Sequence, residues 1–155
     1  MKRRTVLALV ALLALVSASS ASAQLLAAKD GPIVYGHHHL NTTNTEAARK
    51  FWIDALGGVL VKYGTNNTEI IKFPNALLFM REANKPAPTG GSKGTTVDHI
   101  GFEIKNLAEF LKKLEAKGIK LETAYREVPA IGLNISYLYD PTGVYIEMTE
   151  GYTGY

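Results

Sequence analysis

The stretch "YGHHHL", Tyr35 to Leu40, contains three of the four histidines in the chain, and the fourth is His99. Imidazole nitrogens bind divalent metals and exchange protons near neutral pH, so these side chains are the first candidates for chemistry. The chain has no cysteine, which excludes thiolate chemistry and leaves His, Asp and Glu as metal ligands. The run is open to three interpretations: a metal site, a solvated polar run, or one ligand with two bystanders.

The first 23 residues have the pattern of a secretory signal peptide. A basic start, Lys2 to Arg4, precedes an apolar run from Val6 to Val16, and small residues end at Ala23. The apolar run is shorter than the roughly 20 residues that a membrane anchor needs. We therefore expect an exported protein, periplasmic or extracellular. The two arginines also fit the twin-arginine route, which would export the protein folded and already metal-loaded.

The net positive charge belongs to the expected signal peptide. Residues 2 to 4 supply three of the seventeen Lys and Arg, so the remaining chain balances fourteen basic against fourteen acidic residues. This balance argues against nucleic acid as a partner and, after signal removal, against an anionic membrane. The expected organisation is a signal peptide over 1–23, an N-terminal linker over 24–32 and one domain over 33–155.

Two segments of the domain repeat one order of elements: "HHHLNTTNTEAARKFWIDALGG" from His37 and "HIGFEIKNLAEFLKKLEAKGI" from His99. Each predicts a strand, a polar turn and an amphipathic helix that ends at glycine, with Thr45 and Asn106 as the expected N-caps. Three short strands are expected after each helix, at 59–63, 69–73 and 76–81 and at 119–125, 133–139 and 144–149.

The repeat predicts an α+β fold of paired βαβββ modules, which form a U-shaped mixed sheet around one cavity. Module one spans 33–82 and module two spans 97–150. Residues 83–96, rich in Pro, Gly and small polar residues, are expected to form an exposed linker. About 50 residues make a marginal core, so the modules are expected to form one domain together.

Strand alternation separates the three neighbouring histidines. Apolar residues at 100, 102 and 104 form the face expected under the second helix, so His99 belongs to the opposite face. Alignment of His37 with His99 places His37 and His39 on the cavity face, and it places His38 on the side of the first helix.

The last strand contributes a carboxylate to the same cavity. Val144, Ile146 and Met148 form its apolar row, so Glu147 faces the histidines. A single inward His or Glu is more often structural, but equivalent positions in two modules favour a site. His37, His99 and Glu147 form a set of two histidines and one carboxylate that suits a divalent metal with open positions, Fe(II) in particular. Zinc held by His37 together with His39 is an alternative.

Residues 33 to 150 resemble the vicinal-oxygen-chelate superfamily, which contains glyoxalase I, extradiol dioxygenases, and fosfomycin- and bleomycin-resistance proteins. The resemblance depends on the two repeated segments and on "YLYDPTGVYIEMTE". It implies a metal bound by His37, His99 and Glu147, whose vacant positions chelate two neighbouring oxygens of a small-molecule substrate. It also implies a possible homodimer, because this family often pairs modules across two chains.

The resemblance is closest to extradiol dioxygenases. Glyoxalase-type members have a fourth ligand at the end of module one, where this chain places Met80 or Phe79; Glu82 would reach that place only with a two-residue slip. Tyr137 occupies the position of a tyrosine that extradiol enzymes carry before their Asp-Pro turn. Their upstream proton-handling histidine is missing from "EVPAIGLNIS", and His39 is the candidate substitute.

The resemblance therefore predicts an exported enzyme with one divalent metal ion, Fe(II) by its ligand set, with Zn or Mn as alternatives. Tyr137 and His39 are the candidate catalytic residues. Two other functions are open: a glyoxalase-like lyase, or a non-catalytic small-molecule binding or resistance protein. The binding protein would use an aromatic cavity, for which Tyr35, Tyr137, Tyr139 and Tyr145 are the candidate walls.

Overall fold

The computed structural model describes residues 33, 35–82, 88 and 90–152, with Glu82 described by its backbone alone. The expected signal peptide, 1–23, and N-terminal linker, 24–32, lie outside these residues, as do 83–87 and 89 of the expected module linker. None of the described helices has the length and apolar character needed to cross a membrane.

Module one begins with the strand that carries the three histidines. Its elements are β1 (His37–Thr42), α1 (Thr45–Lys50) with a π-helical continuation (Phe51–Ala55), β2 (Val59–Tyr63), β3 (Thr68–Phe73) and β4 (Ala76–Glu82). They form a four-stranded sheet in the order β1-β4-β3-β2. β1 is parallel to β4, and the other pairs are antiparallel.

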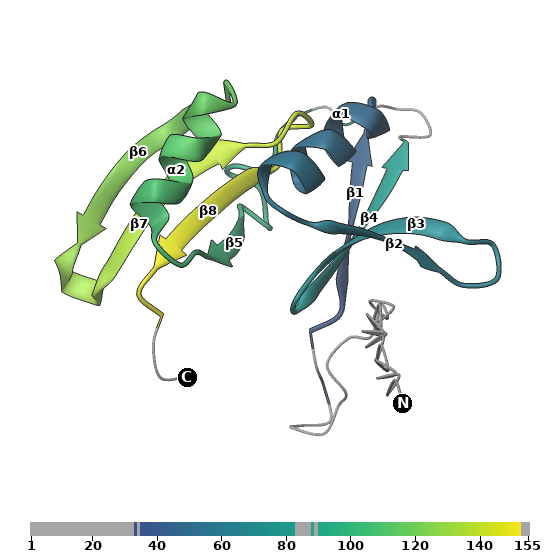
Figure 1. The fold of residues 1–155 in the computed structure, drawn as a ribbon, viewed down its shortest axis with the longest axis horizontal. Helices are drawn as coiled ribbons and strands as arrows, with labels where there is room; N and C mark the ends of the chain where they lie inside the picture. The colour runs from purple at the N-terminus through teal and green to yellow at the C-terminus, as the bar shows by residue number, and fades with distance from the viewer. Residues whose placement is uncertain (1–32, 34, 83–87, 89, 153–155) are drawn as a thin grey trace, which may run out of the picture.

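Module two repeats this arrangement. Its elements are β5 (Ile100–Glu103), α2 (Leu107–Ala116), β6 (Leu121–Val128), a 3₁₀ turn (Pro129–Ile131), β7 (Leu133–Tyr139) and β8 (Tyr145–Glu150). The sheet order, β5-β8-β7-β6, corresponds strand for strand to that of module one. The paired βαβββ modules are thus confirmed, and their strands form two mixed sheets that lie side by side (Figure 1).

The two helices are capped by different residues than the sequence suggested. Asn44, and not Thr45, caps α1: its side chain accepts the Ala47 N–H at 2.9 Å. Asn106 occupies the N-cap of α2 but makes no side-chain cap bond. The carboxylate of Glu150 replaces it and accepts the N–H groups of Asn106 and Leu107. The end of β8 therefore fixes the start of α2.

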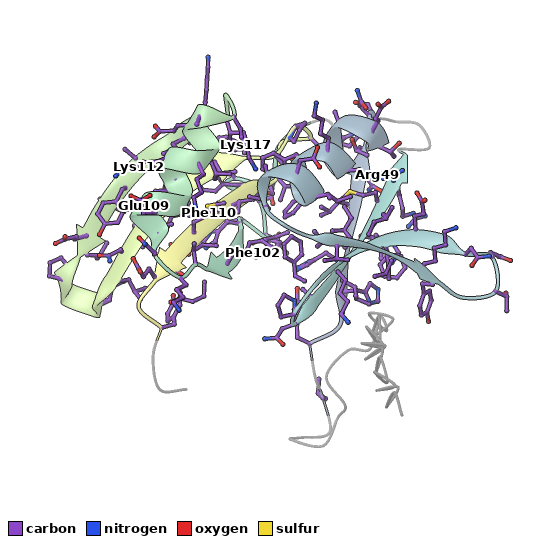
Figure 2. The ribbon with its side chains drawn as sticks, viewed as in Figure 1. Arg49, Phe102, Glu109, Phe110, Lys112 and Lys117 are labelled. Atoms are coloured by element: carbon purple, nitrogen blue, oxygen red, sulfur yellow. The ribbon has the colours of Figure 1, made fainter. Side chains whose placement is uncertain are left out.

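One apolar core joins the modules on the helix side of both sheets. Trp52 is completely buried, and its ring contacts Phe102 of module two with centroids 5.9 Å apart. Phe73 lies 5.1 Å from the same Phe102 ring. Figure 2 shows Phe102 and Phe110 between the two modules, and it shows Lys117 beside α1. The Lys117 ammonium donates to the carbonyl of Asp54, which adds a polar contact between the modules.

A buried carboxylate links the modules across this core. Asp140, only 4% exposed, accepts a hydrogen bond from Trp52 Nε1 at 3.1 Å. It also accepts the backbone N–H groups of Thr142 and Val144, each at 2.8 Å. The Asp-Pro-Thr-Gly turn before β8 is therefore closed by the same side chain that holds the indole of module one.

We predict that Asp140→Ala destabilises the protein by about 3 kcal/mol, because it leaves the indole N–H and two backbone N–H groups without their acceptor. Urea unfolding measures the loss. Asp54→Ala, an exposed change near the same junction, is the control and should stay within about 0.5 kcal/mol of the parent. Equal losses in the two variants would contradict the structural role of Asp140.

Candidate metal centre

His99 and Glu147 of module two meet on the face of the sheet opposite α2. The parallel ladder pairs Gly101 with Glu147. His99 comes two residues before Gly101, so its side chain lies on the same face of the sheet, next to the carboxylate. Its Nε2 atom is 3.2 Å from Glu147 Oε2. Both side chains are partly accessible, at 37% for His99 and 18% for Glu147. Strand alternation therefore placed these two candidate ligands correctly relative to each other.

Asp98 fixes which nitrogen of His99 faces Glu147. Its Oδ1 atom lies 2.8 Å from His99 Nδ1 and accepts that N–H. This bond, followed by one from the Gly94 N–H, holds the pKa of Asp98 below its usual value. When Nδ1 carries the proton, Nε2 presents its lone pair to a carboxylate oxygen. Two acceptors at 3.2 Å need a shared cation between them, either a proton or a metal.

Tyr137 belongs to the same cluster. Its hydroxyl donates to Glu147 Oε1, the oxygen that does not face His99. Burial, together with this bond to Glu147, raises the pKa of Tyr137, so the phenol stays protonated at neutral pH. Its ring stacks on Tyr145 with centroids 5.0 Å apart. In this arrangement Tyr137 orients the carboxylate of Glu147.

The equivalent place in module one has no carboxylate. His39 pairs with Phe79 in the β1–β4 ladder, as Gly101 pairs with Glu147 in the β5–β8 ladder. Phe79 therefore stands where Glu147 stands, and Met80 pairs with Leu40 one residue further along. Of the two residues expected at the fourth ligand position, the register selects Phe79. It also excludes the slip that would move Glu82 there, since Glu82 pairs with Thr42.

His37 and His39 lie together on the face that carries Phe79. Their ring centroids are 5.0 Å apart, and His39 stacks on Phe79 at 4.7 Å. His39 is exposed; desolvation by its neighbours, followed by the His37 and Arg81 charges, lowers its pKa, so the imidazole is unprotonated at neutral pH. Within residues 33, 35–82, 88 and 90–152 no three His, Cys, Asp or Glu side chains are grouped to hold a metal. The chain thus brings His99 to Glu147 but does not bring His37 to either.

His38 lies on the face of β1 that also carries buried Leu40, as alternation predicted. It is half-buried and forms a hydrogen bond with the Tyr35 hydroxyl. Burial, and then the charge of His37, lower its pKa. With Phe73 and Phe102 it lines a cavity of about 960 Å³ between the modules.

A short strap, residues 90–98, holds one end of the site, and the sequence did not reveal it. The expected exposed linker is anchored here: Ser92 N donates to the Gly143 carbonyl, and Ser92 Oγ accepts the Tyr145 N–H. Lys93 pairs with Glu122 at 2.5 Å and lies 4.4 Å above the Tyr145 ring. The sequence offered one signal for the role of Asp98, namely that an acidic residue directly precedes the candidate ligand His99.

His99 and Glu147 supply two donor atoms of the types that bind divalent metals. An imidazole nitrogen and a carboxylate oxygen converge on one point, and each side chain has its outer atoms hydrogen-bonded, by Asp98 and by Tyr137. Metal-binding histidines usually donate their second N–H to such a partner, which fixes the ring and raises its basicity. The third candidate, His37, would complete a two-histidine, one-carboxylate set.

We predict that Lys93→Ala raises the pKa of Glu122 from about 2 toward its ordinary 4.5, because the Lys93 ammonium is the main cause of the depression. A depressed carboxyl pKa stabilises the fold above pH 4.5 and ceases to do so as the pH falls toward 2. NMR titration of the Glu122 carboxyl measures the shift. Lys112→Ala, on the outer face of α2, is the control; an equal Glu122 pKa in the two variants would refute the strap contact.

The comparisons with known proteins agree with this fold. The Glyoxalase/Bleomycin resistance protein/Dioxygenase superfamily matches residues 34–148. No curated protein was found to match the chain. A glyoxalase/dioxygenase from Nostoc punctiforme has a similar structure, with a TM-score of 0.64. It is 18% identical, and the match covers 83% of this chain and 97% of that one.

Two further solved structures are similar. Lactoylglutathione lyase from Agrobacterium tumefaciens is 26% identical, with a TM-score of 0.55 over 77% of this chain and 95% of its own. A glyoxalase family protein from Bacillus anthracis is 18% identical, with a TM-score of 0.59 over 77% of this chain and 93% of its own. The family match covers both modules and both faces that carry the candidate ligands. The chain belongs to the Glyoxalase/Bleomycin resistance protein/Dioxygenase superfamily.

Proposed function

We propose that the protein is an exported, metal-dependent enzyme that binds a small molecule through two neighbouring oxygens, with His37, His99 and Glu147 as the metal ligands. The observation that carries the proposal is the 3.2 Å approach of His99 Nε2 to Glu147 Oε2, with Nδ1 of the same ring bonded to Asp98. This arrangement calls for a cation. The ligand types favour Fe(II), with Zn or Mn as alternatives.

We infer that His37 reaches the centre from a second copy of the chain. The modules share their core on the helix side, and the described part of the chain groups no third ligand with His99 and Glu147. The face of module one that carries His37 also exposes Tyr63 and Val59, 54% and 52% accessible, which suits a protein interface. In a twofold dimer, the His37 face of each chain would lie over module two of its partner. The dimer would therefore contain two equivalent centres.

The side chains around the centre would divide the remaining work. A bound divalent metal would polarise the two substrate oxygens as a Lewis acid and leave positions open for them. Tyr137 would hold the Glu147 carboxylate through its hydroxyl, and it would keep that proton because its pKa is raised. His39, unprotonated at neutral pH and exposed beside His37, would accept a proton from a substrate hydroxyl.

Phe79 favours a dioxygenase-like centre over the alternative, a glyoxalase-like lyase. Its phenyl ring occupies the register position equivalent to Glu147, so module one offers no carboxylate there. Fewer protein ligands leave more positions for substrate and dioxygen. The likeness to the Agrobacterium lactoylglutathione lyase supports the lyase. The neighbouring Tyr137, Tyr139 and Tyr145 rings would also suit a binding protein without catalysis.

We predict that the mature protein from its native compartment contains one divalent metal per chain. His37→Ala, His99→Ala and Glu147→Ala should each lower the metal affinity at least about tenfold, since each removes a ligand atom. Elemental analysis after dialysis measures the metal content. His38→Ala is the matched control, because it removes the neighbouring histidine on the opposite face of β1 from His37. Full metal content in all three ligand variants would refute the centre.

Activity assays then separate the candidate functions. Oxygen uptake with catechols identifies a dioxygenase, whereas turnover of the glutathione adduct of methylglyoxal identifies a lyase. Tight binding of aromatic compounds by a protein without metal identifies the binding protein. Metal loss in His39→Ala as complete as in His37→Ala would show that both neighbouring histidines are ligands.

A mixing experiment tests the shared centre. Dimers formed from His37→Ala and His99→Ala chains have one site with both histidines intact and one with neither. Random reassociation of equal amounts should therefore restore about a quarter of the parent's metal sites, as follows from twofold symmetry. Metal analysis after unfolding and refolding the mixture measures the recovery. No recovery, while the parent recovers fully under the same treatment, would show that His37 does not act across two chains.

A further inference from the structure

Both oxygens of the Asp98 carboxylate accept hydrogen bonds. Oδ1 accepts the His99 Nδ1–H at 2.8 Å, and Oδ2 accepts the backbone N–H of Gly94. The main-chain carbonyl of Asp98 accepts the Ser92 hydroxyl at 2.8 Å. Three bonds therefore hold this residue, one to the neighbouring ring and two to the strap.

The strap is itself fixed to β8, the strand that carries Glu147. Ser92 N donates to the Gly143 carbonyl at 2.9 Å, and Ser92 Oγ accepts the Tyr145 N–H at 2.8 Å. Gly91 lies so close to this turn that a Cβ atom there would be 2.5 Å from the Gly143 oxygen. A chain of hydrogen bonds thus runs from the start of β8 through Ser92 and Asp98 to the ring of His99.

We propose that Asp98 is a positioning residue for the metal centre: it holds His99 in the tautomer and ring orientation that point Nε2 at Glu147. This inference depends on the proposed function, because the position matters only where a metal binds. Without Asp98, an imidazole 37% exposed could rotate or carry its proton on Nε2, where it would donate to Glu147 and leave no lone pair for a metal. Asp98 therefore favours the form of His99 that can bind a metal.

The test uses Asp98→Ala, Asp98→Asn and Ser92→Ala in the full mature protein. Zn²⁺ affinity, measured by competition with a chelator, should fall about 10- to 100-fold in Asp98→Ala, as for other partners of metal-bound histidines. Asp98→Asn keeps an oxygen acceptor for the Nδ1–H and should recover part of the loss. Ser92→Ala loosens the strap but leaves the carboxylate beside His99, so it should lose less affinity than Asp98→Ala.

A second readout does not need the metal. Nitrogen NMR of the metal-free protein, at a pH where His99 is unprotonated, should show the proton on Nδ1 in the parent and on Nε2 in Asp98→Ala. The proton on Nε2 in the parent would overturn the inference, as would equal Zn²⁺ affinities of the parent and Asp98→Ala. If the parent itself binds no Zn²⁺, Fe(II) or Mn(II), the proposed function fails, while the NMR result still decides whether Asp98 sets the tautomer.

Discussion

The burial of Trp52 between the modules is the constraint on which the rest of the arrangement depends. The indole is completely buried, contacts Phe102, and gives its N–H to Asp140 of the other module. This junction commits the helix side of each sheet to one shared core. The opposite faces, which carry the candidate ligands, then point away from that core and stay accessible. A chain folded this way presents two half-sites.

Register decides what each half-site contains. Side chains alternate across a strand, so a slip of one residue would exchange the faces of a whole strand. The β5–β8 ladder brings a carboxylate beside His99, and the β1–β4 ladder brings a phenyl ring beside His39. Burial of Leu40, 8% exposed on one side of β1, and the ring contacts of Phe79 with His37 and His39 on the other side hold this register. The packing that fixes the register therefore also decides which module has a carboxylate beside its histidine and which has a phenyl ring.

The sequence was sufficient to predict the features that depend on a regular pattern of residues, such as the repeated modules and the faces of the strands. The repeated segments that begin at His37 and His99 predicted both modules, and the apolar row of Val144, Ile146 and Met148 predicted the face on which Glu147 lies. It was insufficient where the outcome depends on a contact between distant segments. Glu150 replaces Asn106 as the cap of α2, and Asp140 reaches Trp52, 88 residues away. No local pattern encodes either contact.

The strap shows the same limit at the site itself. Its composition of glycine and small polar residues predicted an exposed linker, because such residues rarely form a core. The described residues of this segment are mostly exposed, but they also use backbone groups and one hydroxyl to reach Gly143 and Tyr145, contacts that depend on the turn before β8.

The strap and the cation site are consequently coupled. Asp98 and Tyr137 bind the outer atoms of His99 and Glu147 and leave one nitrogen and one oxygen facing each other at 3.2 Å. Such an arrangement is electrostatically unfavourable without a cation, so a proton or, in the proposed function, a metal would occupy the point between them. Asp98 biases that choice, since a ring whose proton lies on Nδ1 has no N–H to offer the carboxylate. Under the proposed function, the segment that joins the modules would thereby also help to prepare the second module for a metal.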